Sequence, residues 1–292
     1  MLRPKGKLIA VGGAEDKGVE SDEEFKNHLN THFAELQILR RIKEEMRSDN
    51  PVIEVITTAS MIPEEVGDNY INAFNKLNCS RINLMHIRDR IDVKEQEYVD
   101  RIKKADGVMF SGGNQLRLSM VFGGSEILDV LEDRYMKEDF VIAGTSAGAM
   151  AMSNTMIYQG SSSEALLKGE VKLTTGLAFI KDVIIDSHFV KRGRFGRLAQ
   201  SIATNPACVG VGLGEDTGLL IKNGDEFEAI GSGLVIIVDG HHIKHTNIVE
   251  AKDGSPISIE NLKVHVMAKG NYYKLEERQF YSKIENGVEA KV

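Results

Sequence analysis

Short apolar runs and amphipathic stretches alternate along the first half of this 292-residue chain. The apolar runs have the length of strands, and the stretches between them have the periodicity of helices. Strand and helix in strict turn predict βαβ units, and therefore an α/β fold with a mostly parallel sheet flanked by helices. The predicted strands are Lys7–Val11, Val52–Thr57, Ile82–Ile87 and Gly107–Phe110, and the predicted helices are Ser21–Arg47, Ile62–Leu77, Val93–Lys104 and Gln115–Tyr135, the last interrupted at Gly123–Gly124.

The second half of the chain is richer in predicted strands. Turn signals such as Asn-Gly and Asp-Gly separate short apolar runs after Thr217, as in hairpins and meanders. Because no Pro/Ser-rich linker precedes them, we expect one α/β domain over 1–292 with a β-rich extension from about 217 to 292. The predicted elements are strands at Val183–Ile185, Val209–Leu213, Leu219–Ile221, Glu226–Ile230, Val235–Val238, Ile248–Ala251 and Val264–Met267, and a helix at Gly193–Ala203.

Composition excludes several classes of protein. A hydrophobic content of 42% is ample for a core, and no apolar run approaches the roughly 18 to 20 residues of a membrane span, so we expect a cytoplasmic protein with no membrane partner. The net charge of −7 argues against a nucleic-acid partner. Cys79 and Cys208 are predicted to be buried thiols, and no constellation of metal ligands or cofactor motif is visible.

The segment Phe140–Met150 contains Gly-x-Ser-x-Gly between a predicted strand and a predicted helix. Glycines two residues either side relieve crowding in so tight a turn, and the serine, Ser146, is presented at its apex. The backbone amide of Ala147, at the start of the helix, can face a developing oxyanion. A small-residue turn that only packs a helix on a sheet is the alternative, but the flanking patterns favour a nucleophile elbow.

A serine nucleophile requires a base, and His188 is the preferred histidine. It follows the apolar run Val183–Ile185, and so lies at a strand's carboxyl end as Ser146 does. The alternative order, with the histidine last, would use one of His241, His242, His245 or His265 in the β-rich part. The orienting carboxylate is predicted to be Glu215 or Asp216, which directly follow the strand Val209–Leu213.

Five motifs of the chain stand in the order of a known family. They are Val11–Lys17, Phe110–Leu118, Gly144–Ala149, Asp186–Arg197 and Gly214–Thr217. Taken together, they resemble the cyanophycinase family of serine exopeptidases, peptidase family S51, which is related to α-aspartyl dipeptidase (peptidase E). The resemblance runs from about Gly6 to Met267 and implies a flavodoxin-like fold of the class I glutamine-amidotransferase type.

The resemblance also implies roles for single residues. Ser146 is the implied nucleophile, His188 the base and Glu215 its orienting acid, and the amides of Gly113 and Ala147 form the oxyanion hole. The implied substrate is cyanophycin, a poly-aspartate whose β-carboxyls carry arginine, cut to β-Asp-Arg dipeptides, and a homodimer is common in the family. The implied substrate-binding residues are Gln115, Asp186, Ser187, Arg192, Arg194 and Arg197: the arginines for carboxylates, Asp186 for a guanidinium, and Gln115 for an amide.

Two positions depart from the family pattern. Ser187 stands where a glutamine usually follows the aspartate, and Asn114 stands where an aspartate usually precedes Gln115. These changes bear on specificity more than on catalysis. Alternatives are therefore an α-aspartyl dipeptidase-like enzyme acting on short peptides and a non-catalytic protein that binds Asp/Arg-rich peptides. A nucleotide loop at Gly12–Ala14 is disfavoured because its spacing fits neither Gly-x-Gly-x-x-Gly nor a P-loop.

Overall fold

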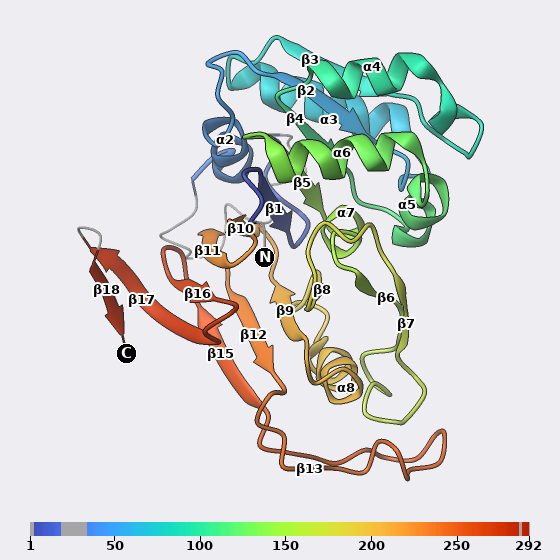
Figure 1. Ribbon diagram of the computed structural model, residues 1–292, viewed down its shortest axis with the longest axis vertical. Coiled ribbons are helices and arrows are strands. Elements are labelled where there is room, and N and C mark those ends of the chain that lie inside the picture. Colours follow the sequence, from blue (N-terminus) through green and yellow to red (C-terminus); the bar gives the residue numbers. More distant parts are fainter. Residues whose placement is uncertain (1–2, 19–33, 286–287, 292) are drawn as a thin grey trace.

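The computed structural model describes residues 3–18, 34–285 and 288–291. The first five strands in the chain form the parallel half of its main sheet, in the order β3-β2-β4-β5-β1. This half confirms the predicted α/β class (Figure 1). The bounds are β1 Lys7–Val11, β2 Val52–Ile56, β3 Arg81–Met85, β4 Gly107–Phe110 and β5 Val141–Thr145.

Helices cover both faces of the parallel strands, as Figure 1 shows. Alternate residues of β1 face opposite ways: Ile9 and Val11 join the cluster under α2 and α3, whereas Leu8 and Ala10 join the larger cluster under α4, α5 and α6. The bounds are α2 Gln37–Glu44, α3 Pro63–Lys76, η2 Asp92–Lys94, α4 Gln96–Lys104, α5 Gln115–Phe122 and α6 Glu126–Lys137.

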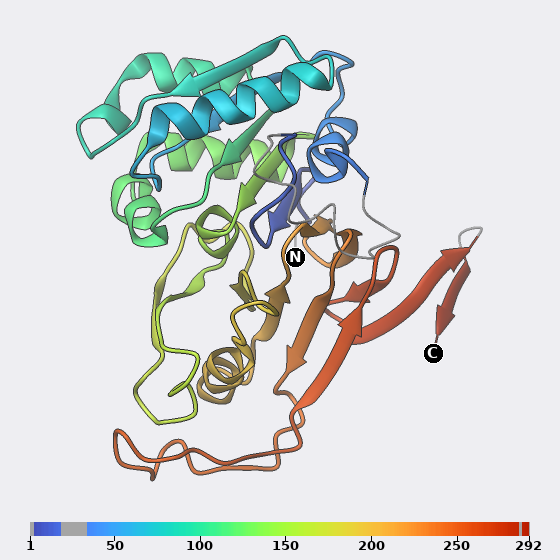
Figure 2. The same cartoon turned by 180° about the vertical axis from the view of Figure 1, so that it is seen from behind.

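The main sheet continues beyond β1 with antiparallel strands in the order β10-β11-β16-β17-β18. The hairpin of the last two strands projects from the body of the molecule in both views (Figures 1 and 2). These strands make up much of the predicted β-rich extension. The bounds are β10 Thr217–Lys222, β11 Glu226–Gly231, β16 Tyr272–Lys274, β17 Gln279–Glu285 and β18 Val288–Lys291.

A second sheet, in the order β15-β12-β9-β8, lies below the first in Figure 1. Its β8 and β9 are parallel, and the other pairs are antiparallel. The predicted strand Val183–Ile185 is therefore part of the second sheet, whereas Ser146 follows β5 of the main sheet. The bounds are α7 Ala147–Met150, β6 Thr155–Gln159, β7 Lys172–Thr175, β8 Val183–Asp186, α8 Phe195–Thr204, β9 Val209–Leu213, β12 Val235–Asp239, β13 His245–Thr246, β14 Ile259–Glu260 and β15 Lys263–Met267.

Two sequence predictions about elements differ from the structure. The first part of the helix predicted over Ser21–Arg47, as far as residue 33, lies outside the described residues. In the described part the helix α2 begins only at Gln37, because the backbone of Leu36 is in the left-handed region and its amide donates to Asp16. The strand predicted at Ile248–Ala251 is wrong: the segment is a turn whose carbonyls at Val249 and Ala251 accept from Lys168 Nζ instead of pairing with a strand.

Candidate active site

Ser146 lies in a strained turn between β5 and α7. Its φ of 49° and ψ of −107° are rare for a residue with a side chain, and such a conformation costs about 1–3 kcal/mol unless its surroundings impose it. The flanking glycines allow the turn, since a Cβ on Gly144 would lie 2.7 Å from the carbonyl carbon of Gly148, and one on Gly148 would lie 2.5 Å from Phe110 O. The local geometry is that of a nucleophile elbow.

The end of β1 and the Gly12–Gly13 turn after it join three segments of the site. The carbonyl of Val11 accepts from the amide of Ser146 at 2.8 Å, that of Gly12 accepts from His188 at 2.9 Å, and that of Gly13 accepts from Asp216 at 3.1 Å. This one stretch therefore fixes the backbones that carry the predicted nucleophile, base and acid. The helix α7 lies at the same junction and contacts β1, β5 and β8 (Figure 1).

His188 is paired with Glu215. Its Nδ1 lies 3.2 Å from Glu215 Oε1, and both side chains are mostly buried, with 18% and 12% exposed. Burial lowers the pKa of His188 from its ordinary value of 6.5; the Glu215 carboxylate opposes this shift and the Arg192 guanidinium adds to it. A largely neutral imidazole held at Nδ1 has Nε2 ready to take a proton. Asp216, the other candidate acid, instead accepts from Gln37 and Ser232.

The hydroxyl of Ser146 approaches Ser187, the residue before His188. The two Oγ atoms are 3.4 Å apart, and Ser187 Oγ also donates to Met150 Sδ at 3.3 Å. Among the hydrogen bonds of residues 3–18, 34–285 and 288–291, none joins Ser146 to the imidazole. Hydrogen bonds of this kind are often long before substrate binds. The structure thus brings Ser146 and the His188 segment together without a direct bond between them.

The predicted oxyanion donors are the backbone amides of Ala147 and Gly113. Ala147 is the first residue of α7, so its amide has no partner within that helix. Gly112 also faces the nucleophile, because a Cβ placed there would lie 3.4 Å from Ser146 Cβ, and Gly113 follows with a φ of +140°. In the part of the chain that the structure describes, no hydrogen bond uses the Gly113 amide. Both predicted oxyanion donors are therefore available.

The predicted substrate-binding ions are partly paired with one another. Asp186 is fully buried and accepts from Arg197 Nε at 2.5 Å, from Arg197 Nη2 and from Arg194 Nη1 at 3.2 Å. Arg197 is only 5% exposed, whereas Arg192 is exposed and Arg194 is half-buried. Asp186 and Arg197 thus form an internal ion pair at the end of β8, and their predicted contacts with substrate remain predictions.

Asn114 and Gln115 begin α5. Asn114 caps the helix by accepting from the amide of Leu116 at 3.0 Å, and Gln115 donates from Nε2 to the carbonyl of Ile157 at 2.9 Å. Ser187, the other departure from the family pattern, is 1% exposed and contacts the predicted nucleophile.

Comparisons with known proteins show the family of the chain. The profile of peptidase family S51 matches residues 27–230. The chain belongs to this family. It is 33% identical over 279 residues to a cyanophycinase of Synechococcus elongatus (96% of this chain, 82% of that one) and 30% identical over 275 residues to a cyanophycinase of Geminocystis herdmanii (94% and 96%).

A crystal structure of a peptidase from an acI-B1 Actinobacterium has the same fold, with a TM-score of 0.61 at 20% identity over 82% of this chain and 93% of that one. This S51 peptidase is accordingly a hydrolase of the serine type, with the flavodoxin-like fold that the sequence motifs imply.

Sequence reasoning overlooked one buried acid of the S51 peptidase. Glu15 is 1% exposed and accepts from Thr145 Oγ1 at 2.5 Å and from the Tyr70 hydroxyl, while Lys17 Nζ lies 2.9 Å away. Burial alone would raise the pKa of Glu15, but the Lys17 charge and these donors hold it below the ordinary value. No local pattern marks Glu15 as buried, because its partners Tyr70 and Thr145 lie 55 and 130 residues away in the chain.

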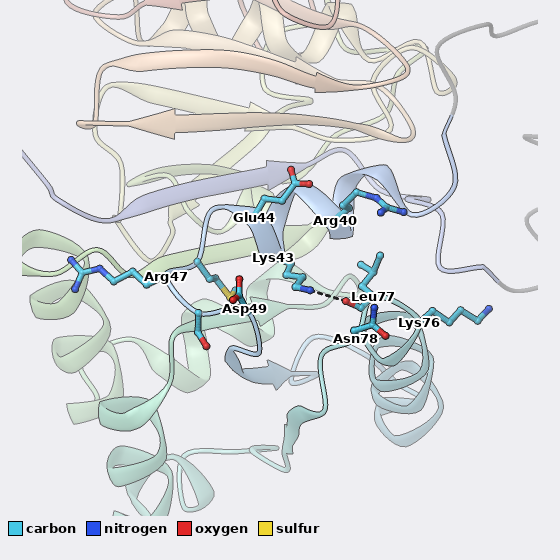
Figure 3. Close-up of a pocket in the computed structure, with 10 residues that line it drawn as sticks. Arg40, Lys43, Glu44, Arg47, Asp49, Lys76, Leu77 and Asn78 are labelled. Atoms are coloured by element: carbon cyan, nitrogen blue, oxygen red, sulfur yellow. Dashed lines mark hydrogen bonds between the residues drawn. The ribbon is translucent and has the colours of Figure 1, made fainter.

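The hollow in Figure 3 is remote from this chemistry. Its volume is about 460 Å³, and it lies beside the last turn of α2 and the chain after α3, at the amino ends of the parallel strands. Lys43 Nζ donates there to the carbonyl of Leu77.

Nowhere in the described residues does a group of three His, Cys, Asp or Glu lie together so that it could hold a metal ion, and no described helix has the length and apolar character to cross a membrane. Cys79 and Cys208 are buried free thiols, as predicted.

Proposed function

We propose that this peptidase hydrolyses cyanophycin to β-Asp-Arg dipeptides through an acyl-enzyme on Ser146. The observation that carries the proposal is the elbow of Ser146 together with the His188–Glu215 pair, in which Nδ1 and Oε1 are 3.2 Å apart. The segments of all three residues are bound to the end of β1 and the turn after it. Relatives named cyanophycinase that align over 94% or more of the chain support the choice of polymer.

In the proposed reaction His188 Nε2 takes the proton of Ser146 as Oγ attacks the scissile carbonyl carbon. Glu215 stabilises the imidazolium through Nδ1, and the amides of Gly113 and Ala147 stabilise the oxyanion. The imidazolium then protonates the leaving nitrogen, and water hydrolyses the ester with His188 as base again. Arg192, which is exposed, binds a substrate carboxylate, and Arg194, which also donates to Asp186 and to the carbonyl of Ser187, contributes a second positive charge.

An α-aspartyl dipeptidase-like activity is the second candidate. The burial of Asp186 against Arg197 favours it, because two ions predicted for the polymer are already satisfied, and a short peptide needs fewer charged contacts. The homodimer that the family resemblance implies is also a proposal.

Product analysis separates these substrates. Purified enzyme is incubated with insoluble cyanophycin and, separately, with α-Asp dipeptides, and products are identified by mass spectrometry. We expect release of β-Asp-Arg by the wild-type protein. Cleavage of the α-Asp dipeptides without release of β-Asp-Arg would assign the second candidate instead. Binding of either substrate with no cleavage would contradict both candidates.

The pH profile should follow His188. The base acts when neutral, so kcat/KM should rise with pH through a pKa below the ordinary 6.5, because burial disfavours the imidazolium. Arg192→Gln removes a charge that lowers this pKa, so the acid limb should move to higher pH. Glu215→Gln removes an opposing charge and should move it to lower pH.

Lys191→Gln is the control for that profile, because it removes an exposed positive charge next in the chain to Arg192. Its acid limb should move less than that of Arg192→Gln. Equal movement of the limb in both variants, or movement in the opposite direction, would exclude His188 as the titrating base.

A further inference from the structure

Glu15 and Thr145 form the second connection between the Gly12–Gly13 turn and the elbow of Ser146. The first is the backbone bond from the Ser146 amide to Val11 O, at 2.8 Å. Two residues beyond the turn, Glu15 accepts from Thr145 Oγ1, and Thr145 immediately precedes Ser146. The residues on both sides of the Thr145–Ser146 peptide are thus held by the last residue of β1 and by the segment that follows it.

The position of Ser146 needs such support. Its backbone lies outside the ordinary regions, and a strained residue keeps its conformation only where several contacts impose it. No direct hydrogen bond joins it to the imidazole in the described residues, so the distance between hydroxyl and base depends on how each backbone is fixed to the shared turn.

The Glu15 carboxylate is itself rigidly held. Its side chain is 0% exposed, and its oxygens are bound by the Tyr70 hydroxyl from α3 and by Lys17 Nζ at 2.9 Å. A buried carboxylate with several donors stays ionised and accepts strongly from a hydroxyl. It is therefore a fixed acceptor for Thr145, and α3 holds it in place through Tyr70.

We propose that Glu15 is a positioning residue for the reaction, acting through Thr145 to hold the strained elbow of Ser146 at the correct distance from His188. The inference rests on the proposed function, since it presumes that Ser146 is the nucleophile. Glu15 touches neither substrate nor the reacting atoms, because its carboxylate is bound to Thr145, Tyr70 and Lys17. Its effect is on kcat through the placement of the hydroxyl.

Thr145→Val tests the connection, because it removes the hydroxyl and keeps the branched shape. We expect kcat to fall about 10-fold to 100-fold with KM nearly unchanged, since small misplacements of a reacting group have effects of this size. The rate of Ser146 acylation by a serine-directed fluorophosphonate should fall in parallel. Thr145→Ser, which restores the hydroxyl, should recover most of both rates.

Glu15→Gln should lower kcat similarly, and the double variant with Thr145→Val should be no slower than Glu15→Gln alone, because both changes break one interaction. Glu54→Gln is the matched control. Glu54 is also 1% exposed and is bound by Arg101 and Asn83, but it lies within β2. It should lower thermal stability without lowering kcat.

Wild-type kcat in Thr145→Val, or a loss that Thr145→Ser fails to recover, would overturn the inference whatever happens to stability. If Thr145→Val does not fold, Thr145→Ala removes the same hydroxyl with less bulk and is read in the same way. Ser146→Ala is run beside these variants. Full activity in Ser146→Ala would overturn the proposed function itself, whereas an inactive Ser146→Ala with an unimpaired Thr145→Val would overturn the role of Glu15 alone.

Discussion

Ser146→Ala is expected to lower peptide hydrolysis by about 10⁴-fold or more while leaving the fold intact. The variant removes the only atom that can form the acyl-enzyme in the proposed reaction, and alanine is smaller than serine, so it adds no bulk to a turn that has no room for a Cβ at Gly144 or Gly148. Thermal unfolding should be nearly unchanged, and covalent labelling by a fluorophosphonate should be lost. The measurements are product release and intact mass after labelling.

Ser153→Ala is a suitable control for this prediction. Ser153 is a fully buried serine shortly after α7. Its hydroxyl has no hydrogen-bond partner among the described residues, so Ser153→Ala removes no hydrogen bond there. That variant should keep both labelling and turnover. Peptide mapping of the labelled wild type also distinguishes Ser146 from Ser187, whose Oγ lies 3.4 Å away. A label found on Ser187, or one retained by Ser146→Ala, would contradict the assignment of the nucleophile.

Combining Ser146→Ala with His188→Ala should cost little more than either alone. Residues that act as one unit show strongly non-additive effects, because once the nucleophile is gone its base has nothing left to activate. Additive losses would mean that His188 contributes to the rate by a route other than deprotonation of Ser146.

The sequence predicts the parallel half of the fold well, because buried parallel strands are continuous apolar runs and their helices are amphipathic. It also locates Ser146, since Gly-x-Ser-x-Gly has a mechanical cause that is local to the turn. The same logic of strand ends predicts His188 as the base, and the structure pairs it with Glu215. However, the assignment of β8 to a second sheet depends on pairing with β9 and, through it, β12, which no local pattern specifies.

Pairings between distant residues are what sequence reasoning misses in the site. Asp186 and Arg197 both look like free ions in the chain, yet the first turn of α8 brings the guanidinium onto the strand end and buries both. Glu15 reads as a loop carboxylate, and only the fold reveals that Thr145 and Tyr70, 130 and 55 residues away, converge on it. Burial of a charge depends on partners that are close in space and far in sequence.

Gly13→Ala is expected to lower kcat by about 100-fold through the base rather than the nucleophile. A Cβ at this position would lie 2.4 Å from Cε1 and 2.5 Å from Nε2 of His188, so the imidazole has to move from the place where it takes the proton. The φ of +107° adds strain to the turn whose carbonyls bind the amides of His188 and Asp216. The measurements are kcat, KM and the rate of fluorophosphonate labelling.

Gly254→Ala separates the displacement of His188 from backbone strain. Gly254 also has a positive φ, of +78°, but a Cβ there would meet nothing within 4 Å, and the residue lies in the connection between β13 and β14. Both variants should lose stability, since alanine is disfavoured at positive φ, but only Gly13→Ala should lose kcat. Equal kcat in the two variants would mean that the imidazole works from a position that the turn does not define. The Gly12–Gly13 turn would then be a structural support for the sheet and not the part that sets the distance between base and nucleophile.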